Sequence, residues 1–238
     1  MEKQNRWVVI TGGTKGIGRA ILEAFLAEGF HGITCARNGK DLSSLRQGLK
    51  AAYPAQRVEI FETDLSKEAG CNAFGTFVKE KITQVEVLVN NAGYFLPGQI
   101  QNEPEGTLES MMETNLYSAY RVTRSLLPLF LEAKKGHIFN VCSTASIIPY
   151  VNGGSYCISK HALLGFSKVL REELKPKGIR VTSILPGATL TSSWEGVDLP
   201  KERFMKAEDV GNAVVGCWKL SQHTVVEEIL LRPQLGDI

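Results

Sequence analysis

Tyr156 and Lys160 are the two residues whose types and spacing point most directly to chemistry. They stand four positions apart in a segment with helical apolar spacing, so their side chains are expected to share one face of a helix. A free phenol has a pKa of about 10, too high for ready proton exchange near neutral pH, and a neighbouring ammonium would stabilise the phenolate. Tyr156 is therefore predicted to donate or accept a proton. The alternative is a lysine lying beside a partly exposed tyrosine, which is common on helices.

Ser143 and the run Asn90-Asn91-Ala92-Gly93 stand at the ends of two predicted strands, residues 137–143 and 85–90. The carboxyl ends of parallel strands face the ligand crevice in open α/β sheets, so both features are expected near Tyr156. A hydroxyl there can hydrogen-bond a substrate oxygen while the phenol transfers the proton, and the amides can fix the loop beneath a cofactor. The alternatives are a turn serine or helix cap, and an ordinary Asn-Gly turn.

A glycine-rich loop, Thr11-Gly12-Gly13-Thr14-Lys15-Gly16-Ile17-Gly18, lies between the first predicted strand and the first predicted helix. Glycines at this place permit a tight turn and let the backbone approach a pyrophosphate, which then lies at the positive end of the helix. A glycine-rich turn without a ligand is the alternative. The position after a strand and before an amphipathic helix favours a dinucleotide site.

The end of the second predicted strand carries the run Cys35-Ala36-Arg37-Asn38. An NAD-selective site usually has Asp or Glu here to accept hydrogen bonds from the ribose 2′-OH. A guanidinium instead suits a 2′-phosphate, and Lys15 in the glycine loop adds a second cation. The predicted cofactor is therefore NADP(H). The alternative is that both cations are solvated surface residues.

Strand and helix patterns alternate from one end of the chain to the other. Strands are predicted over residues 6–11, 31–36, 58–63, 85–90, 137–143, 180–185 and 225–231. Helices are predicted over residues 17–28, 40–53, 66–82, 104–133, 156–175 and 207–220, the fourth interrupted near Thr114-Asn115. This alternation predicts an α/β fold with right-handed crossovers on a parallel sheet. No linker is recognised, so residues 1–238 are expected to form one domain.

Charge and composition argue against several classes of partner. The formal net charge is only +2 and the Lys and Arg residues are scattered, so neither nucleic acid nor a membrane surface is predicted. No apolar run approaches the ~18 residues that a membrane span requires, and no signal segment is recognised, so the expected location is cytoplasmic. Five cysteines without C-x-x-C spacing and four separated histidines favour reduced thiols and no metal site.

Taken in order, these motifs resemble those of the short-chain dehydrogenases/reductases over essentially the whole chain. The matching pieces are Thr11–Gly18, Asp64-Leu65, Asn90–Gly93, Asn115, Ser143, Tyr156-x-x-x-Lys160, and Pro186-Gly187 followed by Thr191. Each piece alone is weak or moderate evidence, whereas their joint occurrence is specific. The resemblance implies a doubly wound Rossmann sheet of seven parallel strands between two layers of helices.

The resemblance also implies a catalytic tetrad of Asn115, Ser143, Tyr156 and Lys160. Tyr156 would be the general acid in reduction, and Ser143 would orient and polarise the carbonyl. Lys160 would hold the nicotinamide ribose hydroxyls and lower the pKa of Tyr156. Asn115 would stabilise a helix break and hold a water of the proton relay.

Cofactor contacts follow from the same resemblance. Asp64 would contact the adenine through its side chain and Leu65 through its backbone, while Thr189 and Thr191 would hold the nicotinamide carboxamide. The full set expected at the cofactor is Gly12, Thr14, Lys15, Gly16, Ile17, Gly18, Arg37, Asp64, Leu65, Asn91, Ala92, Gly93, Tyr156, Lys160, Pro186, Gly187, Thr189 and Thr191. The helices that contain Asn115 and Tyr156 commonly form a subunit interface in such proteins, so a homodimer or homotetramer is expected.

The expected activity is NADPH-dependent reduction of a carbonyl, or the reverse, on a small ketone or ketoacyl substrate. The C-terminal run 232–238 lacks the glycine-rich tail frequent in ketoacyl reductases. The short loop 188–206 and Asp237 instead resemble sepiapterin reductases, in which an acid can grip a pterin, although a solvated tail residue is the alternative. Trp194 either caps the pocket or anchors its loop. One alternative is a protein that binds a dinucleotide as a sensor or scaffold without turnover. Another is an epimerase or dehydratase, which usually needs an additional acid or base near the nicotinamide, and no such residue stands out.

Overall fold

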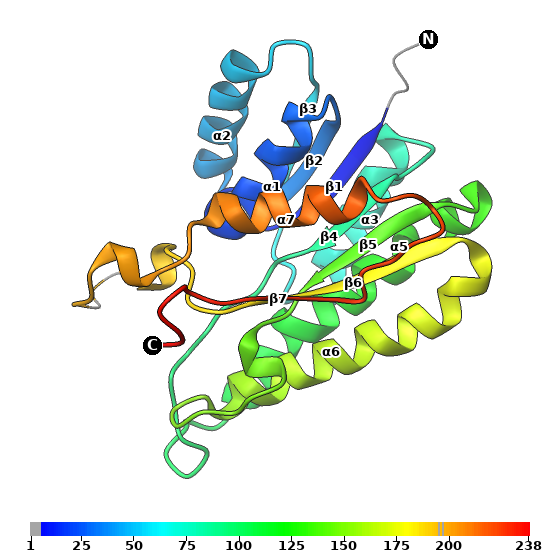
Figure 1. Cartoon of the computed structure of the whole chain (residues 1–238). Coiled ribbons are helices and arrows are strands. Elements are labelled where there is room, and N and C mark those ends of the chain that lie inside the picture. Colours follow the sequence, from blue (N-terminus) through cyan, green and yellow to red (C-terminus); the bar gives the residue numbers. More distant parts are fainter. Residues whose placement is uncertain (1–5, 195, 197) are drawn as a thin grey trace.

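The computed structural model describes residues 6–194, 196 and 198–238, and its centre is a seven-stranded parallel sheet in the order β3-β2-β1-β4-β5-β6-β7 (Figure 1). The strands are β1 (Trp7–Thr11), β2 (His31–Ala36), β3 (Val58–Glu62), β4 (Val87–Asn90), β5 (Gly136–Val141), β6 (Ile179–Pro186) and β7 (Glu228–Leu231). The longer helices are α1 (Gly16–Ala27), α2 (Gly39–Ala52), α3 (Glu68–Lys81), α5 (Ser118–Ala133), α6 (Gly154–Leu174) and α7 (Ala207–Trp218). The reversal of strand order between β1 and β4 confirms the doubly wound Rossmann fold.

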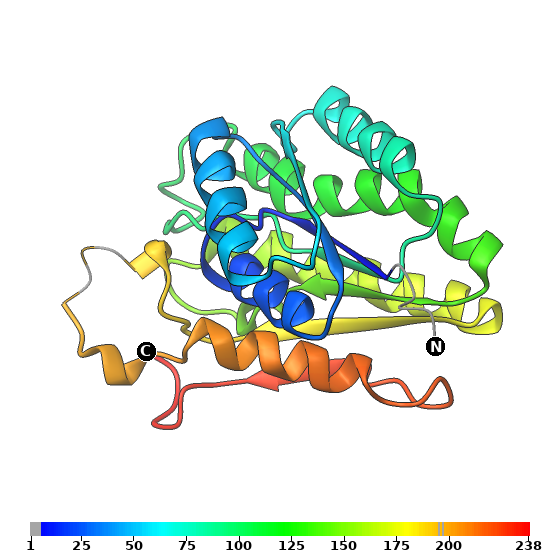
Figure 2. The same cartoon turned by 90° about the horizontal axis from the view of Figure 1, so that it is seen from above.

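Helices cover both faces of this sheet, because alternate residues of each buried strand point to opposite sides. Val8 and Ile10 of β1 pack in a cluster with α1, α2 and α7, whereas Val9 packs in a second cluster with α3, α5 and α6. Figure 2 shows α7 on one side of the sheet and α3 and α5 on the other. The three-layer arrangement is therefore confirmed.

The predicted interruption of the long fourth helix is present as a change of helix type. The helix α4 (Thr107–Met112) is followed by one π-helical turn, Glu113–Tyr117, before α5 begins at Ser118. The fifth strand ends at Val141, two residues earlier than predicted, and Ser143 instead precedes the short helix Thr144–Ser146.

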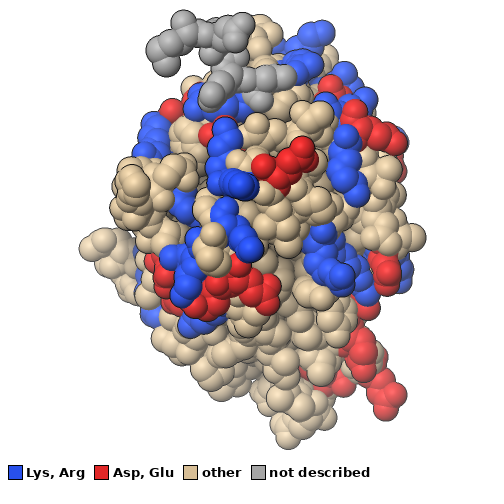
Figure 3. Space-filling model, turned by 90° about the vertical axis from the view of Figure 1, so that its right-hand side faces the viewer, with Lys and Arg blue, Asp and Glu red and all other residues tan. Residues whose placement is uncertain are grey.

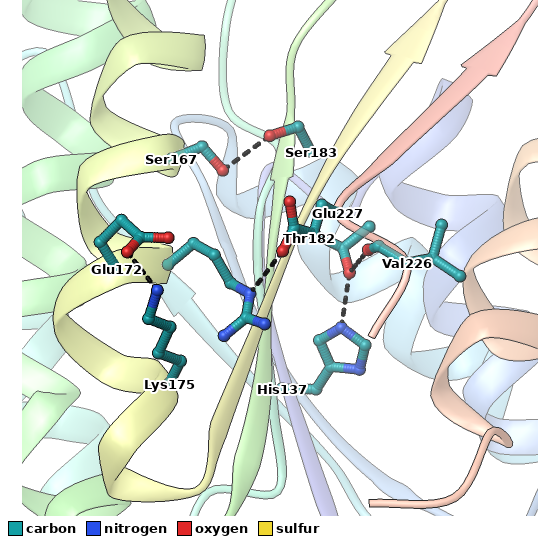
Figure 4. Close-up of polar contacts among 9 residues, drawn as sticks. His137, Ser167, Glu172, Lys175, Thr182, Ser183, Val226 and Glu227 are labelled. Atoms are coloured by element: carbon teal, nitrogen blue, oxygen red, sulfur yellow. Dashed lines mark hydrogen bonds and ion pairs between the residues drawn. The ribbon is translucent and has the colours of Figure 1, made fainter. Parts of the chain in front are cut away.

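The outer strand β7 begins at Glu228, three residues later than the predicted 225, and side chains add to the contacts of the residues before it. The Thr182 hydroxyl donates to the carbonyl of Val226 at 2.6 Å and lies 2.7 Å from His137 Nε2 (Figure 4). Arg171 of α6 donates to Glu227 at 3.1 Å. These contacts hold residues 226–227, which lead into β7, against β6 and α6.

The two ends of the strands differ in character. The face that includes the amino-terminal ends carries Lys and Arg interleaved with Asp and Glu (Figure 3). A cavity of about 380 Å³ lies there, with Arg6, Lys81, Glu86 and Lys135 in its lining. The loops after β4, β5 and β6 extend from the opposite ends, together with the C-terminus (Figure 1). Within the described ranges, none of the helices has the length and apolar character needed to cross a bilayer.

Candidate active site

The glycine loop after β1 has a shape that side chains would prevent. Gly12 and Gly16 have positive φ values of 70° and 56°, which L side chains rarely adopt. A Cβ atom on Gly13 would overlap the hydroxyl of Thr34, which accepts a hydrogen bond from the Gly13 amide at 3.0 Å. A Cβ atom on Gly18 would overlap the Gly12 carbonyl. The loop is thus a compact backbone cradle at the N-terminus of α1, as a pyrophosphate site requires.

The other predicted residues of this loop lie where a phosphate could meet them. Thr14 and Lys15 form the turn that enters α1, and the Lys15 side chain is exposed. Ile17 is partly buried against the cluster shared by α1 and α7. Its packing fixes the first turn of the helix to the sheet.

Asn91 links the end of β4 to the glycine loop. Its side-chain amide donates to the carbonyls of Thr11 at 2.9 Å and Gly12 at 3.0 Å. The backbone amides of Asn91 and Ala92 both donate to the Thr11 hydroxyl. Asn91 therefore holds the cradle from below through its side chain, and Gly93 continues the loop beside it, where a Cβ atom would lie 3.0 Å from Asn115 Oδ1.

Asn115 joins three segments from inside the π-helical turn. Its side chain accepts from the Tyr94 amide at 2.9 Å, donates to the Tyr94 carbonyl at 3.1 Å and donates to Ser159 Oγ at 2.9 Å. It is 1% exposed, so these bonds are shielded from water. Asn115 thereby fixes the loop after β4 against α6, one turn from Tyr156.

Ser143 and Tyr156 are brought together, and the Ser143 hydroxyl is close enough to the phenol to lower its pKa. The Ser143 hydroxyl also accepts from the Ala145 amide at 3.1 Å, and Ser146 Oγ accepts from the Ser143 amide. Ser143 is therefore a helix cap as well as a partner of the phenol. Burial raises the pKa of Tyr156, and the nearby Ser143 hydroxyl opposes that shift, so the ligand-free phenol is protonated at neutral pH.

Lys160 lies under the phenol, with its Nζ 5.8 Å from the centroid of the Tyr156 ring. It is 5% exposed and donates to the carbonyl of Val141, the last residue of β5, at 2.8 Å. Burial lowers its pKa from 10.5 to about 8, against a small opposing effect of Cys142. The pair thus shares one helix face as predicted, but without a cofactor the ammonium is bonded to the backbone.

This buried ammonium predicts an alkaline limit to activity. Lys160 loses its proton in the free protein as the pH rises through about 8, and kcat/KM follows the ionisation of the free enzyme. We expect kcat/KM for NADPH-dependent reduction to fall above about pH 8, while kcat persists to higher pH. Steady-state rates at saturating and limiting NADPH, with the ketone in excess, between about pH 6 and 10 measure both.

The same pKa has a consequence for stability. Because the folded pKa lies below the unfolded value of 10.5, the charge is disfavoured in the fold, and this penalty disappears as the pH rises from about 8 to 10.5. The wild type should therefore gain stability relative to Lys160→Met over that window, as measured by thermal midpoints. A constant difference between the two proteins would contradict the shifted pKa.

The predicted adenine end of the site lies beyond β2 and β3. Arg37 is exposed at the end of β2, and its positive charge helps to lower the pKa of Asp64, which follows β3. Burial opposes a low pKa for Asp64, but hydrogen bonds from Ser66 and the charge of Arg37 together lower it. Leu65 is buried in the core beside α3. Arg37 and Asp64 are thus neighbours, which the sequence alone did not indicate.

The loop after β6 folds back over the glycine loop. Pro186 ends β6, the Gly187 amide donates to Leu231 at 2.8 Å, and the Thr189 hydroxyl donates to the Gly187 carbonyl at 3.0 Å. A Cβ atom on Gly16 would lie 3.1 Å from Thr191 Cγ2. The structure therefore brings Thr191 to the predicted pyrophosphate cradle.

Trp194 and Asp237, the two residues left open at the substrate side, both have partners. The Trp194 ring packs edge to face on Phe204, with centroids 5.0 Å apart, as a loop anchor does. Asp237 forms an ion pair with Arg232, and its Oδ1 would lie 3.2 Å from a Cβ atom on Gly187. Asp237 therefore lies beside the end of β6 and is held there.

Four residues close to Tyr156 were not predicted from the sequence: Phe95, Glu103, Tyr150 and Ser159. Phe95 and Tyr150 form ring contacts around Tyr156, and Ser159 accepts from Asn115. Glu103 accepts from the amide of Ser155 in the first turn of α6. The available signal was position, because Phe95 and Tyr150 stand in the loops that follow the two strand-end motifs. Among the described residues no group of His, Cys, Asp and Glu could hold a metal ion.

Known proteins share this sequence pattern and this geometry. The sequence model of the short chain dehydrogenase family matches residues 6–201. Sepiapterin reductase from Chlorobaculum tepidum is 31% identical over 239 residues, covering 97% of each chain.

The alcohol dehydrogenase of Thermococcus sibiricus, solved with 5-hydroxy-NADP, has a TM-score of 0.89 at 27% identity, covering 96% of this chain and 97% of its own. L-sorbose reductase from Gluconobacter frateurii, solved with NADPH and L-sorbose, has a TM-score of 0.88 at 28% identity, covering 95% and 94%. The chain belongs to the short-chain dehydrogenase family.

Proposed function

We propose that this oxidoreductase reduces a carbonyl group to an alcohol, or runs the reverse reaction, with NADP(H) as the hydride carrier and Tyr156 as the proton donor or acceptor. The observation that carries the proposal is the placement of Ser143 beside Tyr156, with the buried Lys160 ammonium 5.8 Å from the Tyr156 ring centroid, at the same strand ends as the glycine cradle. A positioned acid next to a dinucleotide site is what hydride transfer to a carbonyl needs.

The residues present fit a dinucleotide. Gly12, Gly13, Gly16 and Gly18 leave backbone exposed at the N-terminus of α1 for a pyrophosphate, and a side chain at any of them would close that space or strain the turn. When bound, the reduced nicotinamide supplies a hydride to the carbonyl carbon. Thr189 and Thr191, after β6, would hold its carboxamide, and Asp64 and Leu65 the adenine.

The chain's own residues handle the oxygen and the proton. In reduction, Tyr156 donates its phenolic proton to the carbonyl oxygen as the carbon gains the hydride, so the products are an alcohol and a phenolate. Ser143 holds the same oxygen, and Lys160 stabilises the phenolate through its positive charge. In this role Lys160 would leave the Val141 carbonyl, to which it now donates, and hold the ribose hydroxyls of the nicotinamide cofactor. Asn115 holds the helix turn behind Tyr156, with a water to return the proton.

Arg37 and Lys15 support the choice of NADP(H). Both are exposed cations at the two places where a 2′-phosphate would lie, and no acid replaces them at the end of β2. Two solved relatives, from Thermococcus sibiricus and Gluconobacter frateurii, hold NADP-type cofactors. A guanidinium can bind a phosphate through two hydrogen bonds, which a ribose hydroxyl cannot match.

A pterin carbonyl is the second candidate substrate. The relative from Chlorobaculum tepidum is a sepiapterin reductase, and Asp237 lies beside Gly187 at the substrate end of the site. A carboxylate there could accept hydrogen bonds from an amino group of the ring. Its ion pair with Arg232 would have to loosen for this contact to form.

An oligomer, a homodimer or homotetramer, is part of the proposal. The surfaces of α5 and α6 expose large apolar side chains, including Tyr120 and Leu131 on α5 and Ile158 and Val169 on α6. Apolar residues gathered on two neighbouring helices are typical of a subunit interface.

The proposed activity predicts which cofactor the purified protein consumes. With a panel of ketone, ketoacyl, pterin, quinone and sugar carbonyls, we expect oxidation of NADPH at a kcat/KM at least about tenfold above that of NADH, as one charge-assisted contact provides. Absorbance of the reduced nicotinamide measures both. Equal use of the two cofactors would contradict the role of Arg37. Tight NADPH binding without turnover across the panel would instead favour the sensor or scaffold.

A further inference from the structure

The loops after β4 and β5 place two aromatic rings in series next to Tyr156: Phe95 contacts Tyr156, and Tyr150 contacts Phe95. Phe95 meets Tyr156 edge to face, with ring centroids 4.9 Å apart, and the Tyr150 ring lies 6.5 Å from that of Phe95. Phe95 and Tyr156 are both half-buried, whereas Tyr150 is 47% exposed. Two rings from two different loops therefore extend from the proton donor toward solvent.

These loops are fastened to each other without a ligand. Gly98 and Gly153 form a parallel β-bridge, and the Gly98 amide donates to the Asn152 carbonyl at 2.9 Å. Farther along, Glu103 accepts from both the amide and the hydroxyl of Ser155, in the first turn of α6. Since Tyr156 is the next residue, the bonds that set the rings in place also set the phenol. The surface formed by the Phe95 and Tyr150 rings is therefore preorganised. Binding a substrate ring against this surface costs little ordering entropy.

The same loops carry no charge that could meet an ionic substrate. Residues 91–102 and 143–156 contain no Asp, Glu, Lys or Arg, and the carboxylate of Glu103 is occupied by Ser155. The large apolar side chains that they expose include Leu96 at 48%, Ile148 at 50% and Val151 at 77%. Their exposed polar side chains are the uncharged amides Gln99, Gln101, Asn102 and Asn152. A carboxylate, a phosphate or an acyl group on an acidic carrier protein would find no counter-charge here, and desolvating it would be costly.

Resting on the proposed function, we infer that the substrate is an uncharged carbonyl compound with a planar aromatic ring next to the reactive carbon. Phe95 and Tyr150 hold the ring, and Ser143 and Tyr156 hold the carbonyl oxygen. Flat rings gain from edge-to-face or offset contacts that saturated rings of the same size cannot make. Carrier-bound ketoacyl groups and acidic sugars are outside this class.

Four carbonyl compounds test the inference: acetophenone, cyclohexyl methyl ketone, 4-acetylbenzoate and the acetoacetyl thioester of N-acetylcysteamine. The second lacks the aromatic ring, the third adds a negative charge, and the fourth is a ketoacyl thioester. We expect acetophenone to have the highest kcat/KM with NADPH. Its advantage over cyclohexyl methyl ketone should be about threefold to tenfold, the range that aromatic contacts provide. Higher kcat/KM for 4-acetylbenzoate or the thioester would overturn the inference while leaving the proposed function intact.

The substitution Phe95→Leu removes the aromatic ring but keeps an apolar side chain, so it tests the effect of the ring itself. This variant should remove the preference for acetophenone over the cyclohexyl ketone and leave the Kd for NADPH unchanged. Phe77→Leu is the matched control, because that ring stacks on Phe61 of the edge strand β3, with centroids 4.7 Å apart. The control should keep the preference. A preference that survives in Phe95→Leu would overturn the assignment of the ring site.

A binding measurement keeps this test separate from turnover. The complex of Tyr156→Phe with NADPH is titrated with acetophenone and with 4-acetylbenzoate, and heat or protein fluorescence gives the Kd of each. Tighter binding of acetophenone, weakened in the double variant with Phe95→Leu, would uphold the inference even if no ketone were reduced and the proposed function failed. Equal or reversed affinities would overturn it.

Discussion

Replacing Tyr156 with phenylalanine is expected to lower kcat for ketone reduction by about 10²- to 10⁴-fold, the contribution of a positioned general acid. The phenolic proton is the one that the carbonyl oxygen must receive, and Ser143 can hold that oxygen but is far too weak an acid to replace the phenol. The Kd for NADPH should change far less than kcat, because the glycine cradle and Arg37 do not involve this hydroxyl. Stopped-flow rates of NADPH oxidation and fluorescence titration measure the two quantities.

Tyr53→Phe is the matched control for this experiment. Tyr53 lies at the end of α2 and packs against the cluster on the opposite face of the sheet, so loss of its hydroxyl should leave kcat unaffected. Ser143→Ala should give an intermediate loss, since it removes the bond to the carbonyl oxygen but leaves the acid. If Tyr156→Phe retained kcat within a factor of about ten, the proton would come from another group.

Much of this site could be predicted because it depends on local rules. A glycine loop between a strand and a helix needs no distant information, and its positive φ values follow from residue type. The break near Asn115 was also predicted, but the bonds of its side chain to the Tyr94 backbone join segments 21 positions apart and had no local signal. The carboxyl ends of β1, β4, β5 and β6 then lie at the same edge, because these neighbouring strands all run parallel.

What could not be predicted depends on pairings between distant segments. Glu103 and Ser155 are separated by 52 positions, and neither has a pattern that marks it as a partner. Lys160 was expected to act on Tyr156, but in the ligand-free protein its bond goes to Val141 and burial dominates both pKa values. Burial is a property of the packed fold, so the sequence gives the identity of these groups and not their ionisation.

Arg37→Asp is expected to weaken NADPH binding by about 10- to 100-fold, the range for losing a charge-assisted hydrogen bond, and to shift preference toward NADH. Arg37 is exposed at the end of β2, so its guanidinium is free to meet a 2′-phosphate. The substituted carboxylate would repel that phosphate and accept hydrogen bonds from the 2′-OH of NADH instead. The ratio of kcat/KM values with NADPH and NADH measures the shift.

The neighbourhood of Asp64 decides how the Arg37 result is interpreted. Arg37 helps to lower the pKa of Asp64, so Arg37→Asp removes a cation and sets two carboxylates near one another. Arg37→Gln removes only the cation, and the difference between the two variants isolates the added repulsion. Arg46→Asp, an identical charge change on an exposed residue of α2, should leave the cofactor ratio unchanged. If Arg37→Gln kept the NADPH affinity of the wild type, the 2′-phosphate would be held elsewhere, and Lys15 in the glycine loop would be the remaining cation to substitute.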